Sequence, residues 1–241
     1  MSKMFLLRFV IFVFILMNKV QAQSLNTLTE QEKKEGWQLL FNGKDLKGWH
    51  SFREKAPGKA WQVENGAISL KKNSKSKHED YKDLVTDMEF DNFDFKVEWL
   101  VEPGGNSGVM FYVSEDPQFH ETYETGPEMQ ITDLYVMEDS RINKCRAGDI
   151  YDLIAADTEW VSVGGKWNLY EIKAQNGHIQ LFQNTHKIID TYFWTDEWIK
   201  LIANSKFNQW SSFGTFKSGH ISFQGTESGK LLFRNIRIKQ L

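Results

Sequence analysis

The stretch Phe93-Asp94-Phe95-Lys96-Val97-Glu98-Trp99 decides the fold class, because every second side chain in it is apolar and the side chains between them are charged. Successive side chains of a β-strand point to opposite faces of the sheet, so this period of two predicts a strand with one buried face and one solvated face. The stretch from Tyr170 to Ala174 alternates in the same way. The chain is therefore expected to be built on sheets that are covered on one side.

Further short apolar stretches recur along the chain, separated by turn-forming Gly, Asn and Pro residues. These candidate strands are Trp61–Val63, Gly108–Val113, Glu128–Thr132, His178–Phe182, His220–Gln224 and Leu231–Ile238. Many short strands with frequent turn signals are typical of an all-β sandwich or jelly roll.

One or two short helices are expected beside the strands. Thr29 and Glu32 form a capping-box pattern, and Gly36 is a natural end for the helix that they begin. Later in the chain, Thr195 can cap a segment that opens with two acidic residues, which the helix dipole favours at that end.

The N-terminal residues predict an export signal. Lys3 and Arg8 accompany an apolar run from Phe5 to Met17, and compact residues end at Ala22, where a signal peptidase would cut. The alternative, a membrane anchor, needs roughly 20 apolar residues, and this run is shorter and is interrupted by Arg8. We therefore predict a signal peptide at 1–22, a spacer with a short helix at 23–35 and a single jelly-roll domain at 36–241, located in a periplasm or outside the cell.

Composition excludes several classes of protein. The net charge is −3 and no long basic run is present, which argues against nucleic acid as a partner. Because Cys145 is the single cysteine, no intrachain disulfide can form, and stability must come from packing. The six histidines show no zinc spacing.

Three candidate strands share a polar face. In Glu128–Thr132, Glu128 and Gln130 point away from Met129 and Ile131, since side chains alternate. On the other two strands, the corresponding face holds Asn106, Tyr112, His220 and Gln224. An ordinary solvated face is one interpretation. This face, however, prefers amides, hydroxyls and an imidazole to Lys and Glu, which favours a concave site for sugar hydroxyls.

Only one carboxylate lies on the polar face of the Glu128–Thr132 strand. Retaining glycosidases place two carboxyl groups about 5 Å apart, one as nucleophile and one as acid. The strand therefore gives little support to the usual double displacement.

Seven sequence blocks, in order, resemble the bacterial 3-keto-disaccharide hydrolase family. They are GWQLLFNGKDLKGW, DLVTDMEFDNFDFKVEW, PGGNSGVMFY, ETGPEMQITD, AGDIYDLI, SKF and GHISFQ with LFRNIRI, from about Gly36 to Ile238. The resemblance implies a concanavalin A-like jelly roll, export, and action on glycosides that are already oxidised at the sugar C3. It also implies a functional link to the oxidoreductase that makes the ketone.

A C3 ketone acidifies the hydrogen at C2, so elimination followed by hydration needs one base and no glycosyl-enzyme nucleophile. On this hypothesis Glu128 is the base. His220 or a divalent metal of unknown ligands stabilises the enolate oxygen. Hydroxyls are held by residues of the polar face, namely Asn106, Tyr112, Gln130 and Gln224.

Glu124, just before the Gly126-Pro127 turn, could reach the cleft as an acid, although loop carboxylates are usually solvated. Asp149 and Tyr151 form a further cluster, with a turn role as the alternative to substrate binding.

One departure from the family pattern concerns function. Where family members tend to read Gln-Asp-His-Gly, this chain reads Gln224-Gly225-Thr226-Glu227, so an imidazole is missing. Two alternatives to the enzyme therefore stay open: a carbohydrate-binding module of the same fold, which would bind sugar without cleaving it, and a structural protein, which would bind no sugar.

Overall fold

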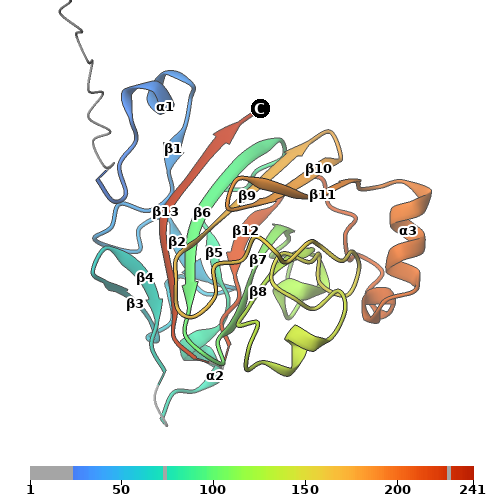
Figure 1. Ribbon diagram of the computed structural model, residues 1–241, viewed down its shortest axis with the longest axis horizontal. Helices are drawn as coiled ribbons and strands as arrows, with labels where there is room; N and C mark the ends of the chain where they lie inside the picture. Colours follow the sequence, from blue (N-terminus) through green and yellow to red (C-terminus); the bar gives the residue numbers. More distant parts are fainter. Residues whose placement is uncertain (1–23, 73–74, 227–228) are drawn as a thin grey trace, which may run out of the picture.

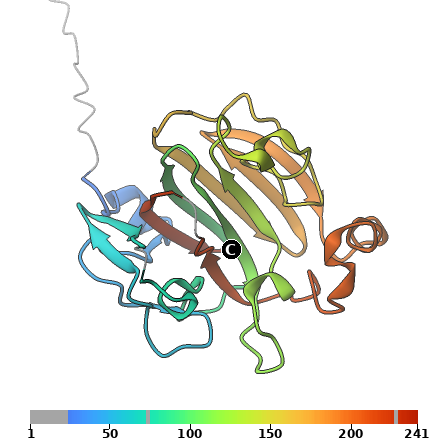
Figure 2. The same cartoon turned by 90° about the horizontal axis from the view of Figure 1, so that it is seen from below.

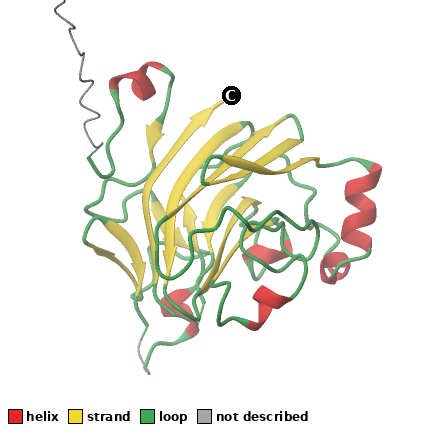
Figure 3. Ribbon diagram, in the orientation of Figure 1, coloured by secondary structure: helices red, strands yellow, loops and turns green. Residues whose placement is uncertain are grey.

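The computed structural model describes residues 24–72, 75–226 and 229–241 as two antiparallel sheets with short helices at their edges (Figures 1 and 3). The predicted signal peptide, 1–22, lies outside these residues. None of the described helices has the length and apolar character needed to span a bilayer.

The larger sheet contains eight strands. Its order is β11 (His186–Tyr192), β10 (His178–Gln183), β9 (Asn168–Gln175), β6 (Phe93–Val101), β13 (Leu231–Gln240), β4 (Ala67–Leu70) and β3 (Trp61–Glu64), with β1 (Gln38–Leu39) beside β13. The smaller sheet runs β2 (Trp49–Ser51), β5 (Leu84–Thr86), β12 (His220–Phe223), β7 (Asn106–Val113) and β8 (Glu128–Thr132).

The core lies between the two sheets. Phe93, Phe95, Val97 and Trp99 on β6 are all buried, as their alternation predicts. Phe223 of the smaller sheet stacks on Phe233 of the larger one, with ring centroids 4.1 Å apart. Aromatic residues that bury large areas thus join the layers. The prediction of an all-β sandwich is confirmed.

Both predicted helices are present. The first is α1 (Glu30–Lys34), where the Thr29–Glu32 capping box forms. The second is α3 (Asp196–Ala203), whose cap Thr195 accepts a hydrogen bond from the backbone N–H of Trp198. Figure 2 shows α3 at one side of the molecule, opposite the β3–β4 hairpin.

Short helical turns were not predicted from the sequence. They are α2 (His78–Tyr81) and the 3₁₀ turns η1 (Thr122–Glu124), η2 (Glu138–Arg141) and η3 (Lys206–Gln209). Two of them, η1 and η3, carry side chains to a cavity beside the smaller sheet.

Candidate active site

Strand β8 projects Glu128 and Gln130 into a cavity on the outer face of the smaller sheet. Met129 and Ile131 of the same strand are fully buried in the core between the sheets. Because side chains alternate along a strand, Glu128 and Gln130 face the other way. The predicted division of this strand into an apolar and a polar face is confirmed.

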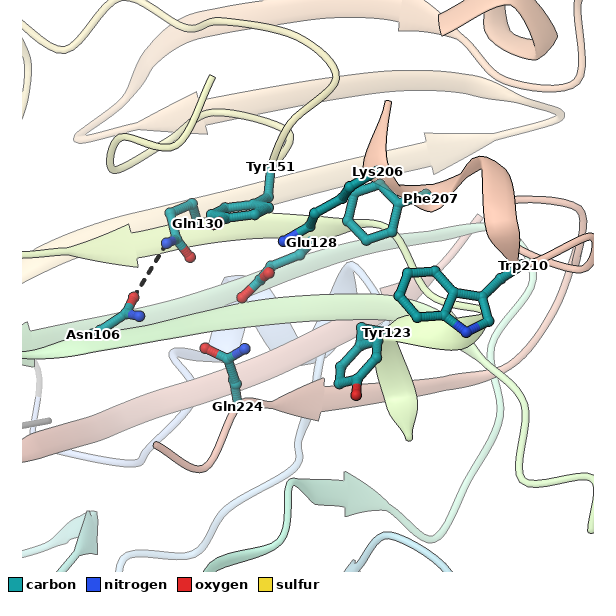
Figure 4. Close-up of a pocket in the computed structure, with 9 residues that line it drawn as sticks. All are labelled: Asn106, Tyr123, Glu128, Gln130, Tyr151, Lys206, Phe207, Trp210 and Gln224. Carbon is teal, nitrogen blue, oxygen red and sulfur yellow. Dashed lines mark hydrogen bonds between the residues drawn. The ribbon is translucent and has the colours of Figure 1, made fainter. Parts of the chain in front are cut away.

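The cavity has a volume of about 290 Å³. Its walls come from strands of the smaller sheet, from η1 and η3, and from the loop after β8 (Figure 4). The lining residues are Asn106, Tyr123, Glu128, Gln130, Tyr151, Lys206, Phe207, Trp210 and Gln224.

The carboxylate of Glu128 lies over the glycine of the neighbouring strand. In the β7–β8 ladder Gly108 is opposite Gln130, and Met110 is opposite Glu128. A Cβ at Gly108 would overlap Oε1 of Glu128. The missing side chain therefore leaves room for the carboxylate of Glu128, a residue that is only 7% exposed.

Amide side chains form one end of the cavity. Nε2 of Gln130 donates to Oδ1 of Asn106 at 3.1 Å, which fixes the orientation of both amides. Oε1 of Gln130 is buried without a hydrogen-bond partner among the described residues. A ligand hydroxyl that reached this oxygen would satisfy it. Gln224, which follows β12, completes this end, and its backbone N–H donates to the carbonyl of Gly108 at 3.0 Å.

Lys206 brings a positive charge into the cavity from η3. Its backbone N–H donates to Oδ2 of Asp152 at 2.7 Å, and its ammonium lies 3.9 Å from the ring centroid of Tyr151. The distance to the Phe207 ring is longer, 5.2 Å. The ammonium is therefore held on the Tyr151 side, where a cation over an aromatic face is stabilised.

Aromatic side chains form the other end. Tyr123 and Trp210 meet edge to face, with ring centroids 5.3 Å apart. Trp210 also lies 6.0 Å from Phe207. Since Phe207 is buried and stacks on Phe213 at 4.0 Å, this wall is anchored in the core.

The structure brings together five of the residues predicted from sequence as site residues: Glu128, Asn106, Gln130, Gln224 and Tyr151. Their roles stay predictions. Four lining residues were missed, namely Tyr123, Lys206, Phe207 and Trp210. The SKF block, Ser205–Phe207, was the one sequence signal that pointed to this region.

The prediction that Tyr112 shares the polar face is wrong. Tyr112 has a left-handed backbone conformation, with φ of 59°. The pairing of β7 with β12 shifts its register near this residue. This β-bulge reverses the alternation of inward and outward side chains along β7. The ring is 1% exposed, packs against Phe93 and Phe111, and donates its hydroxyl to the carbonyl of Asp91 at 2.8 Å.

His220 also lies outside the lining of the cavity. Its Nδ1 donates to the backbone carbonyl of Thr86 at 2.6 Å. Its Nε2 is 3.5 Å from Glu89 and 3.6 Å from Glu115, whose carboxylate is 2.8 Å from Nε2 of His50. The ring therefore belongs to a separate cluster of charged groups.

Glu124 and Asp149 do not line the cavity either. Oε1 of Glu124 accepts the backbone N–H of His120 at 3.2 Å. Asp149 accepts the backbone N–H groups of Ala156 and Arg146, at 2.6 and 2.7 Å. Burial raises the pKa of Asp149, while these two donors lower it. Asp149 thus organises the loop that presents Tyr151, which is the turn role considered from the sequence.

Among the described residues, no group of three or more His, Cys, Asp or Glu side chains is arranged to hold a metal ion. The charged groups available in the cavity are Glu128 and Lys206. A carboxylate and an ammonium among amides can perform acid–base chemistry on a polar ligand.

Comparisons with known proteins identify the family. Residues 36–239 match a family described as the 3-keto-alpha-glucoside-1,2-lyase-like domain. A protein named 3-keto-disaccharide hydrolase from Bacteroides thetaiotaomicron is 27% identical over 246 residues, which cover 92% of this chain and 84% of that protein.

Solved structures show the same fold. A candidate glycosyl hydrolase from Parabacteroides distasonis is 30% identical, with a TM-score of 0.80, and the match covers 90% of this chain and all of that one. A Bacillus subtilis protein with a galectin-like fold is 13% identical, with a TM-score of 0.50, over 80% of this chain and 94% of that one. The concanavalin A-like sandwich predicted from the sequence is therefore confirmed.

Proposed function

Because this chain belongs to the 3-keto-alpha-glucoside-1,2-lyase-like family, an enzyme family, we propose that it cleaves 3-keto disaccharides by elimination at C2, with Glu128 as the base. The observation that carries the proposal is the nearly buried Glu128 carboxylate in a cavity that also holds Lys206 and the amides of Asn106, Gln130 and Gln224.

In the first step the Glu128 carboxylate takes the proton from C2, which the neighbouring ketone makes acidic. The C–H electron pair forms a C2=C3 double bond, and the carbonyl pair moves onto the C3 oxygen. Lys206 supplies a positive charge for this enolate oxygen. Stabilisation of the enolate oxygen, which was predicted from the sequence for His220 or a metal, is thus assigned to Lys206.

In the second step the enolate collapses. The C3 carbonyl reforms, the double bond moves to C1=C2, and the C1–O bond breaks with its electron pair going to the leaving oxygen. That oxygen takes a proton from the carboxylic acid of Glu128, which restores the base. Water then adds across C1=C2, with its hydroxyl at C1 and a proton at C2.

The test is incubation of the protein with a 3-keto disaccharide and its unoxidised parent in deuterated water, followed by mass spectrometry. Cleavage of the keto form alone, with deuterium at C2 of the product, is the expected result. Cleavage without deuterium at C2 would exclude the elimination. Binding without cleavage would favour the carbohydrate-binding module.

Variants assign the base. Glu128→Gln should lower kcat about 100- to 10,000-fold, the usual contribution of a general base, whereas Glu102→Gln, on an exposed loop outside the cavity, should retain full turnover. Loss in Glu124→Gln together with full turnover in Glu128→Gln would move the base to Glu124.

Export is the second part of the proposal. The charged and apolar segment that ends at Ala22 supports cleavage by a signal peptidase and delivery to a periplasm or the medium. N-terminal sequencing of protein from fractionated cells tests this, and a mature chain that begins at Gln23 is expected. Intact Met1 in the cytoplasmic fraction would refute it.

A further inference from the structure

We propose that the cavity binds its substrate in one orientation, with the keto sugar at the amide end and the leaving group against Tyr123 and Trp210. The leaving group would be one with a flat apolar face, either a second pyranose ring or an aromatic aglycone. This inference rests on the proposed function and adds to it the residues that select the leaving group.

The two ends of the cavity differ in chemistry. In Figure 4, the amides of Asn106, Gln130 and Gln224 lie at one end, and the rings of Tyr123 and Trp210 lie at the other. Glu128 and Lys206 occupy the middle of the view. A substrate with one hydroxyl-rich part and one apolar face therefore meets a matching surface in only one of its two directions.

The position of the charged groups selects that direction. The base must reach C2, and C2 lies between C1, which carries the leaving group, and C3, which carries the ketone. The Lys206 ammonium is closer to the ring of Tyr151, at 3.9 Å, than to that of Phe207, at 5.2 Å. The ammonium therefore lies toward Tyr151 and away from Phe207, on the side on which this orientation places the C3 oxygen.

The reverse orientation would direct the ketone to the aromatic wall. Developing negative charge on the C3 oxygen would then face the rings of Tyr123 and Trp210 instead of an ammonium. The apolar C–H face of the leaving sugar would lie against the amides, and the buried Oε1 of Gln130 would stay without a hydrogen bond, which carries a cost.

The aromatic wall is fixed before any ligand arrives. Trp210 ends η3, where its backbone N–H donates to the carbonyl of Phe207 at 3.0 Å. Phe207 is held in the core against Phe213. Tyr123 comes from η1, a separate segment, and remains 38% exposed. Since rings that are held in place lose little freedom on binding, the wall is suited to recognition.

The test uses three substrates that share the 3-keto glucosyl group and differ in the leaving group. These are a 3-keto disaccharide, a 3-keto 4-nitrophenyl glucoside and methyl 3-keto glucoside. For each one, kcat/KM of Trp210→Ala is divided by that of the wild type. The intrinsic ease of departure of each leaving group cancels in this ratio.

We expect Trp210→Ala to lower kcat/KM about 10- to 100-fold on the disaccharide and the nitrophenyl substrate, a loss typical of truncating an aromatic anchor. The methyl glycoside should change less than about threefold, because its leaving group does not reach the wall. A loss on the nitrophenyl substrate alone would assign the wall to aromatic aglycones, and a loss on the disaccharide alone to sugars.

Matched variants keep the result interpretable. Tyr123→Ala changes a partly exposed ring of the same wall and should follow the same pattern, even if Trp210→Ala is poorly folded. Trp160→Ala changes a ring that is also 38% exposed but lies outside the cavity, and should leave all three ratios near one. Equal losses on all three substrates, or no loss on any, would overturn the orientation.

A binding measurement separates this inference from the proposed function. If the wild type cleaved none of the substrates, the proposed function would fail, and the orientation would be judged by titration of the three compounds. A tighter affinity for the disaccharide than for the methyl glycoside, abolished by Trp210→Ala, would still support it. Equal affinities, or no binding at all, would refute it.

Discussion

The carboxylate of Glu128 fills the space that a side chain at Gly108 would occupy. The two residues lie on adjacent strands, β8 and β7, and Gly108 is directly opposite Gln130. The absence of a Cβ on β7 thus allows a nearly buried carboxylate to lie flat on the sheet at the floor of the cavity.

Gly108→Ala should therefore displace the proposed base. Gly108 is not among the glycines with positive φ, so the backbone accepts alanine, and the clash is with the side chain of Glu128. A misplacement of about 1 Å can reduce a rate on the order of 100-fold, and we expect a loss of that size in kcat. Steady-state kinetics on the 3-keto disaccharide measure it.

A double variant shows whether the effect passes through Glu128. In the Glu128→Gln background, Gly108→Ala should cause little further loss, because residues in contact do not act additively. Independent, multiplicative losses would mean that the added methyl group disturbs another part of the cavity.

Lys206→Met should lower kcat by about 100- to 1,000-fold, the loss typical of removing one group that stabilises a developing oxyanion. The methionine keeps an unbranched stem beside Tyr151 but lacks the charge. Lys206→Arg should restore part of the rate, since it retains a positive charge with a different geometry. Lys200→Met, on the exposed side of α3, is the matched control. Unchanged kcat in Lys206→Met would leave the enolate without an assigned cation.

The sequence predicted the strands whose two faces meet different surroundings. The alternation in β6 and β8 reports a buried face and a polar face, and both are present. By contrast, β4 and β5 are only four and three residues long, Ala67–Leu70 and Leu84–Thr86, and they were missed. Strands this short show too few alternating positions for a period of two to stand out.

Five of the nine residues that line the cavity were predicted from the sequence. Two of these, Glu128 and Gln130, follow from the alternation in one strand. Lys206 begins η3 and Trp210 directly follows it, about 80 residues later in the chain, and only the tertiary fold brings that turn over β8. Tyr112 was misplaced because a left-handed conformation at a tyrosine has no signal comparable to a glycine.

Tyr112→Phe tests the corrected position of this side chain. It removes the hydroxyl that donates to the carbonyl of Asp91 and leaves the ring in the core. The free energy of unfolding should fall by about 1 kcal/mol, the usual contribution of one hydrogen bond. KM and kcat should not change. Urea unfolding measures the stability, and steady-state kinetics on the same preparation measure KM and kcat. A raised KM with unchanged stability would return Tyr112 to the binding site.

Asp83 connects two walls of the cavity and gives stability a dependence on pH. Its Oδ1 accepts the backbone N–H of Gly225, next to Gln224, at 2.8 Å. Its Oδ2 accepts the hydroxyl of Thr122, next to Tyr123. Burial raises the pKa of Asp83 to about 7, although both hydrogen bonds lower it.

The sign follows from the two pKa values of Asp83, 3.8 in a model compound and about 7 in the fold. The folded protein holds the proton more tightly, so the stabilising contribution is complete below pH 3.8 and is lost as the pH rises through 7. The free energy of unfolding of the wild type minus that of Asp83→Asn should therefore fall between pH 4 and pH 8, by on the order of 1–4 kcal/mol. Urea titrations at several pH values measure it, with the exposed Asp157→Asn as control. Curves for the wild type and Asp83→Asn that stay parallel would show that the pKa of Asp83 is the same in the folded and unfolded protein, and that the hydrogen bonds from Thr122 and Gly225 offset its burial.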